Sequence, residues 1–247
     1  MKFSLFITYF EQKQFWPYCL ESIRYQTRKP DEIILGIDSD TDSIPDLQGL
    51  NFSVVRPYGK NPARSGRGLC INQALKLSAC EIMVTTDADC ILHPRLIEYY
   101  EKIYTSRLTK WEYTVHGGGG RKPYRTVHAV KKSDVLNQIF VGPRFFIPLP
   151  NKLPEVSGNL WEDVDGLSTH DYHGCRGREG HVAKIMGCNM AFFTRLFKYA
   201  QFKHGRGQDE TWQRDLERKR PKVFTVRPAP DYCYVLHMGP NNVGQYW

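Results

Sequence analysis

The sequence lacks any long apolar run and any export signal. No stretch approaches the roughly 20 consecutive apolar residues that a membrane-spanning helix needs, so we expect no membrane span. Met1 and Lys2 lead directly into a strand-like segment, without the small-residue cleavage site that ends a signal peptide. These absences predict a cytoplasmic protein.

Cysteine is sparse and shows no pairing pattern. The seven cysteines are odd in number and none form a Cys-x-x-Cys pair, which argues against a disulfide framework. Five of them lie in apolar or structured surroundings and are expected to be buried, reduced thiols: Cys19, Cys70, Cys80, Cys90 and Cys188.

Acidic residues are fewer than basic ones. The chain has 34 Lys and Arg against 26 Asp and Glu, a formal net charge of +8. This excess favours an anionic partner such as a nucleotide, a nucleic acid or a phosphorylated polymer, with solubility alone as the alternative. The length of 247 residues, 41% of them hydrophobic, suits a single domain, residues 1–247, with a substantial core.

The first part of the chain alternates strands and helices. Apolar segments predict strands at residues 3–10 and 32–37, with an amphipathic helix between them. This order is a βαβ unit, which predicts an α/β fold with a parallel sheet. Ligands bind beyond the carboxyl ends of such strands, where Thr8, Tyr9 and Asp38 lie.

A basic loop precedes the next helix. A short strand at residues 52–56 leads into a loop that holds Arg64 and Arg67, and a helix is expected over residues 69–79. The two arginines would meet phosphate there, because free amides and the helix dipole favour anions at a helix start. A solvated loop is the alternative.

A buried, strand-like run at residues 82–86 ends in two carboxylates one residue apart. In extended geometry Asp87 and Asp89 face the same side and converge on one small volume. Such groups repel unless a cation lies with them, and oxygen ligands suit Mg²⁺ or Mn²⁺, which commonly also hold phosphates. We therefore predict a metal-bound diphosphate at Asp87 and Asp89. Helix capping before Pro94 is the alternative.

Several of these motifs, in this order, resemble the opening of family 2 glycosyltransferases of the GT-A fold. The resemblance rests on residues 19–27, 32–42, 67–72 and 86–94. It implies an α/β, Rossmann-like GT-A fold with a mostly parallel central sheet flanked by helices. It also implies a nucleotide-sugar half at residues 1–95, with a UDP-sugar as the expected donor. Thr8, Tyr9 and Asp38 would line the nucleoside pocket, and Asp87 and Asp89 would hold the metal and the sugar diphosphate.

The remaining residues, 96–247, contain a segment that resembles the acceptor half of inverting GT-A enzymes. Gly207 matches the family glycine, Gln208 stands where a Glu is usual, and Asp209 matches the catalytic base. Because of this departure Glu210 stays open as an alternative base. Two acids at a helix N-terminus would also be favourable without catalysis, through the helix dipole.

A strand predicted near the C-terminus includes His237, which the resemblance makes a third metal ligand. Neutral imidazole suits Mn²⁺ better than Mg²⁺. Residues 111–181 match no motif and are expected to be a variable insertion. A zinc site there, from four ligands, is a lesser alternative to a polar loop at the acceptor site: His170, His173, Cys175 and His181.

Together these features predict a metal-dependent inverting glycosyltransferase that uses a nucleotide sugar. A hydroxyl on a saccharide or surface polymer is the expected acceptor. A modified base in DNA is an alternative, because the basic loop and the basic residues within 214–222 would suit phosphates. A metal-dependent nuclease or phosphotransferase would account for the acid pair and the charge, but not for the βαβ start.

Overall fold

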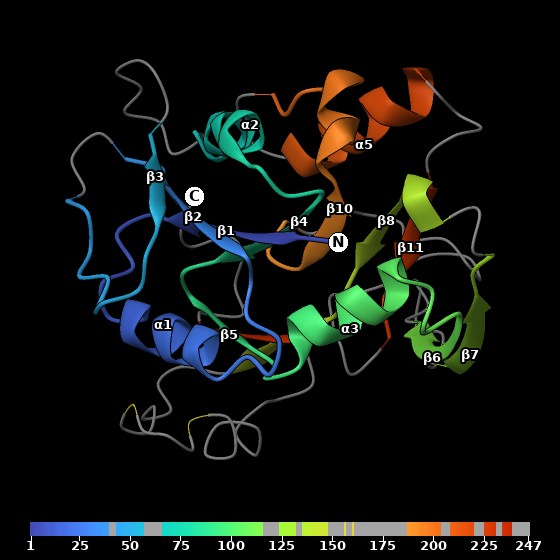
Figure 1. Cartoon of the computed structure of the whole chain (residues 1–247), viewed down its shortest axis with the longest axis horizontal. Coiled ribbons are helices and arrows are strands. Elements are labelled where there is room, and N and C mark those ends of the chain that lie inside the picture. Colours follow the sequence, from blue (N-terminus) through green and yellow to red (C-terminus); the bar gives the residue numbers. More distant parts are fainter. Residues whose placement is uncertain are drawn as a thin grey trace.

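A seven-stranded sheet organises the fold (Figure 1). The computed structural model describes residues 1–39, 43–56, 66–115, 124–131, 135–147, 156, 160, 187–203, 208–219, 225–230 and 234–238. The strand order is β11-β8-β10-β4-β1-β2-β3. The strands are β1 Phe3–Tyr9, β2 Glu32–Ile37, β3 Ser53–Val55, β4 Ile82–Asp87, β8 Gln138–Val141, β10 Met190–Phe193 and β11 Thr225–Pro228.

Neighbouring strands are parallel everywhere except beside β10, which runs antiparallel to both β4 and β8. The middle strands β1 and β4 are mostly apolar, and every residue of β1 is buried. Such continuous burial is expected where helices cover both faces of a sheet. The predicted α/β fold with a mostly parallel central sheet is confirmed.

In the described part of the chain, four helices cover the sheet on its two faces. Figure 1 shows α1 (Trp16–Arg24) and α3 (Leu96–Tyr104) on one face, and α2 (Arg67–Leu77) and α5 (Gln208–Lys219) on the other. The helix expected over residues 69–79 thus begins two residues earlier, at Arg67, directly after Gly66. Apolar side chains from both faces join β1, β2 and β4 in one core. The five cysteines expected in the interior are buried.

The register of the sheet aligns the expected ligand-binding residues. Thr8 of β1 lies opposite Gly36 of β2 on one side and Asp87 of β4 on the other. Asp38 follows β2 directly, and its N–H donates a hydrogen bond to the carbonyl of Tyr9 at 2.9 Å. The carboxyl ends of β1, β2 and β4 therefore meet at one edge of the sheet.

Two smaller sheets complete the described structure. β12 (Val235–Met238) lies between β5 (Cys90–Leu92) and β9 (Arg144–Ile147), and its His237 is opposite Cys90. β6 (Lys110–Val115) pairs with β7 (Tyr124–Ala129). Two 3₁₀ helices, η1 (Val135–Asn137) and η2 (Thr194–Lys198), precede β8 and follow β10. Through its pairing with β5, β12 thus lies next to the turn that follows β4.

None of the helices in the described part of the chain has the length and apolar character needed to cross a bilayer. The cytoplasmic location and the division of the domain at residue 95 stay predictions.

A buried histidine on the β6–β7 hairpin should make stability depend on pH. Burial, aided by the charge of Arg227, lowers the pKa of His128 from 6.5 to about 4. The unfolded chain therefore protonates at a higher pH than the folded protein. The stability contributed by His128 is complete above pH 6.5 and is lost as the pH falls toward 4.

We expect His128→Phe, which keeps an aromatic ring against Trp111, to reduce this loss by about 1 to 3 kcal/mol between pH 7 and pH 4. Urea denaturation of both proteins across this range measures the difference. Parallel curves for wild type and variant would contradict the buried, neutral state of His128.

Candidate active site

Arg67, at the first position of α2, lies between two carboxylates at the carboxyl edge of the sheet. One terminal nitrogen, Nη2, is 3.0 Å from Oδ1 of Asp87, and the other, Nη1, is 3.6 Å from Oδ2 of Asp209. Its Nε donates a hydrogen bond to Oγ1 of Thr8 at 3.1 Å. The guanidinium therefore connects β1, β4 and α5, and its side chain is only 16% exposed.

Asp209 lies in the first turn of α5 and is held from a second direction. Its Oδ2 accepts a hydrogen bond from the N–H of Gly187 at 3.0 Å. A Cβ on residue 187 would lie 2.4 Å from both terminal nitrogens of Arg67, so only glycine lets the guanidinium pack this closely. Glu210 follows in the same turn, but its side chain lies outside the described part. The choice of base between Asp209 and Glu210 stays a prediction.

Asp87 and Asp89 have different partners. β4 ends at Asp87 and the chain turns through Ala88 and Asp89, so the extended geometry that would align the two carboxylates does not persist. Asp87 pairs with Arg67, whereas Oδ2 of Asp89 is 3.3 Å from Nε2 of His237. Because of the turn, Asp87 contacts Arg67 while Asp89 contacts His237.

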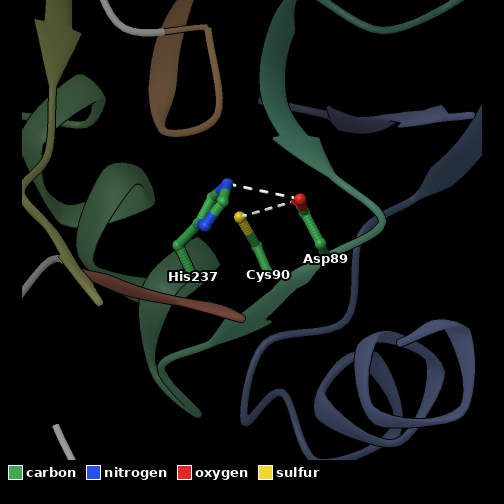
Figure 2. Close-up of side chains that lie close together, drawn as sticks. All are labelled: Asp89, Cys90 and His237. Carbon is green, nitrogen blue, oxygen red and sulfur yellow. Dashed lines mark hydrogen bonds and ion pairs between the residues drawn. The ribbon is translucent and has the colours of Figure 1, made fainter. Parts of the chain in front are cut away.

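A cluster of three possible metal ligands forms around Asp89. Figure 2 shows Asp89, Cys90 and His237 pointing toward one another from the β4–β5 turn, β5 and β12. One ligand atom of each lies within 4.8 Å of the other two, and Sγ of Cys90 is 3.8 Å from Oδ1 of Asp89. Among the described residues this group includes Asp89 and His237 of the predicted ligands, but not Asp87.

Burial and charge set the protonation of this cluster. Burial raises the pKa of Asp89 to about 6, against the opposing effects of hydrogen bonds and of Arg144. Burial, reinforced by Arg144, lowers the pKa of His237 to about 3. Burial also raises the pKa of Asp87, against the charge of Arg67. His237 is thus a neutral imidazole near pH 7, the form that binds metals.

The donor set fits a divalent first-row metal ion. A buried carboxylate with a raised pKa is stabilised in its ionised form by a nearby cation. Carboxylate and neutral imidazole are both ligands of Mn²⁺, and the thiol of Cys90 adds a softer donor. Asp89 and His237 would therefore be the principal ligands.

The residues expected at the nucleoside lie at the same edge of the sheet but differ in exposure. Thr8 is 7% exposed, and Tyr9 is fully buried with its ring packed edge-on against Trp16. Asp38 is partly exposed at the end of β2. The predicted phosphate ligand Arg64 and the four residues of the suggested zinc site lie outside the described residues.

Two residues, one in the cluster and one beside it, have no motif in the sequence. Arg144, at the start of β9, lies near enough to oppose ionisation of His237 and to favour that of Asp89, and its Nη1 is 3.7 Å from Sγ of Cys188. Cys90 is expected from the sequence only to be buried. The pairing of β12 with β5 and β9 brings both residues to His237. Local sequence does not encode that pairing.

The sequence also matches a known family model. The model described as "Glycosyl transferase family 2" matches residues 4–107, which run from β1 through α3. This match confirms the resemblance to family 2 glycosyltransferases that the motifs predict for this part of the chain. No curated protein matches the sequence.

Solved structures share this fold at low sequence identity. Residues 1–349 of TarS from S. aureus are 16% identical with a TM-score of 0.53, and the match covers 96% of this chain and 60% of that one. Glucosyl-3-phosphoglycerate synthase from Mycobacterium tuberculosis, in complex with phosphoglyceric acid, is also 16% identical with a TM-score of 0.53. That match covers 96% of this chain and 72% of that one. The chain thus spans about 60% of the length of the TarS fragment.

The site predicts a measurable response to metal alone. Saturating Mn²⁺, at about 100 times its dissociation constant, should stabilise the protein by about 2.7 kcal/mol and raise its melting temperature. We expect Asp89→Asn to abolish this shift, because the variant loses the anionic ligand. Glu81→Gln, which changes a carboxylate that is 58% exposed and lies at the opposite end of β4 from Asp89, is the matched control. An equal shift in Asp89→Asn and wild type would rule out this metal site.

Proposed function

We propose that this protein is a metal-dependent, inverting glycosyltransferase that moves a sugar from a UDP-sugar to a hydroxyl acceptor. The observation that carries the proposal is the placement of three groups at the carboxyl edge of β4. Asp89 and His237 lie 3.3 Å apart, and Asp209 lies 3.6 Å from Arg67, which also contacts Asp87. A metal site and a carboxylate base are the two groups that such a transfer requires.

The solved relatives support the choice of donor and metal. TarS 1–349 has been crystallised with UDP-GlcNAc. The mycobacterial glucosyl-3-phosphoglycerate synthase has been crystallised with Mn²⁺, UDP and glucosyl-3-phosphoglycerate. We propose the same classes of donor and metal for this chain, with Thr8, Tyr9 and Asp38 at the nucleoside and Asp87 and Asp89 toward the diphosphate.

The residues of this chain would divide the chemistry as follows. Asp89 and His237 would hold a divalent cation, which when bound neutralises charge on the leaving diphosphate. Asp209 would take the proton of the acceptor hydroxyl as its oxygen attacks the anomeric carbon. The bond from that carbon to the diphosphate breaks as the new bond forms on the opposite face, so UDP leaves and the anomeric configuration inverts.

The acceptor is proposed at the level of chemical class. A saccharide or surface-polymer hydroxyl is the first choice. The mycobacterial synthase has been crystallised with phosphoglyceric acid, a small acid, so the acceptor panel must include anionic alcohols. The DNA alternative rests on the net charge, the basic loop and the basic residues within 214–222, and finds no support among these relatives.

The role of Asp209 can be tested by removing its charge. We expect Asp209→Asn to lower the rate of UDP release by about 100-fold or more, since a general base contributes about 100- to 10,000-fold. Binding of UDP with Mn²⁺, measured by calorimetry, should not change. Asp215→Asn, on the same helix but paired with Lys203, is the matched control and should keep wild-type activity.

The assay is UDP release from UDP-glucose, UDP-GlcNAc and UDP-galactose with Mn²⁺, with and without acceptor alcohols. If Glu210→Gln loses activity while Asp209→Asn keeps it, the base is Glu210. Wild-type protein that neither binds UDP nor consumes any of these donors would contradict the proposed function, and the acid pair would then be tested as a nuclease centre.

A further inference from the structure

Arg67 contacts three protein groups at once. Its Nε faces Thr8, Nη2 faces Asp87 and Nη1 faces Asp209. The planar guanidinium is the only side-chain cation that presents several N–H donors in a fixed fork, so it can hold partners in three directions. Both of its terminal nitrogens therefore lie close to carboxylates of this chain.

The charges around Arg67 argue against a primary role in binding phosphate. One positive guanidinium lies between the carboxylates of Asp87 and Asp209, so the three ionised groups together carry a net negative charge. A diphosphate bound directly to this guanidinium, with no metal ion between it and the carboxylates, would meet both of them at short range, and like charges repel strongly where burial weakens solvent screening.

From this geometry we propose that Arg67 is a positioning residue that fixes the carboxylate of Asp209 relative to the donor-binding strand β4. The inference rests on the proposed role of Asp209 as base. Arg67 joins α5, which carries Asp209, to Asp87, one residue from the β4–β5 turn that carries Asp89. The distance between the base and the metal-held diphosphate is therefore set through one guanidinium.

Gly187 also helps to hold Asp209 and Arg67 in position. Its N–H holds Asp209 at 3.0 Å, and its missing side chain gives the guanidinium room to lie against the backbone. The carbonyl of Gly187 accepts a hydrogen bond from the hydroxyl of Thr85 on β4, which fixes the position of this backbone. Asp209 is thus held by two groups. One is the guanidinium of Arg67 on α2, and the other is the N–H of Gly187, whose carbonyl is hydrogen-bonded to β4.

Two variants test the proposal from opposite sides. Arg67→Lys keeps the positive charge but has a single nitrogen that cannot reach all three partners. Gly187→Ala keeps the guanidinium but places a Cβ at 2.4 Å from its nitrogens, so the guanidinium must shift. Arg95→Lys is the matched control, because Arg95 pairs with Glu98 on the surface of α3.

The measurement separates turnover from donor binding. We expect kcat for UDP release at saturating UDP-sugar to fall by about 100-fold in both variants, as displacement of a catalytic group by about 1 Å does. The dissociation constant for UDP with Mn²⁺ should stay at the wild-type value, and Arg95→Lys should match wild type in both. Unchanged melting temperatures would show that the variants are folded.

The opposite pattern would overturn the inference. If Arg67→Lys weakens UDP binding while kcat at saturating donor is retained, Arg67 holds the donor phosphate instead. If both variants keep wild-type kcat, the contact between Arg67 and Asp209 does not position the base. Failure of the wild-type protein itself to bind UDP is a separate result that contradicts the proposed function.

Discussion

The site depends on the compensation of buried negative charge. Asp87, Asp89 and Asp209 gather at the carboxyl edge of the sheet with little access to water, where an uncompensated carboxylate costs far more than at the surface. Arg67 compensates two of them by direct contact, at 3.0 and 3.6 Å. Asp89 lies instead beside a neutral imidazole, and burial raises its pKa despite the opposing effects of hydrogen bonds and of Arg144. A bound cation would stabilise the ionised form of this carboxylate further.

This division explains why the two acids of the Asp-x-Asp motif are not equivalent. The turn at Ala88 and Asp89 sends one carboxylate toward α2 and the other toward β12. Asp87 becomes part of the internal link to the proposed base, while Asp89 faces the proposed metal. Arg67 accordingly ties the segment matched by the family 2 model, residues 4–107, to the later helix α5.

The sequence was sufficient to predict those features that depend on local pattern. Apolar runs such as residues 3–10 predicted buried parallel strands, and the order of motifs predicted the resemblance to family 2 glycosyltransferases that the family model finds over residues 4–107. The partners of individual side chains could not be predicted. The approach of His237 to Asp89 follows from the β5–β12 register, and the contact of Arg67 with Asp209 follows from the packing of α2, α5 and Gly187. Both are tertiary arrangements between segments far apart in the chain.

The central claim is that Asp89 and His237 hold the metal while Arg67 keeps Asp209 in place beside it. The most direct measurement is a crystal structure of the protein soaked with Mn²⁺ and UDP, with anomalous scattering used to locate manganese. We predict one manganese peak in contact with Asp89, His237 and the diphosphate, with Arg67 still paired to Asp209. A manganese peak away from Asp89 and His237, or Arg67 turned onto the diphosphate with Asp209 released, would contradict the claim.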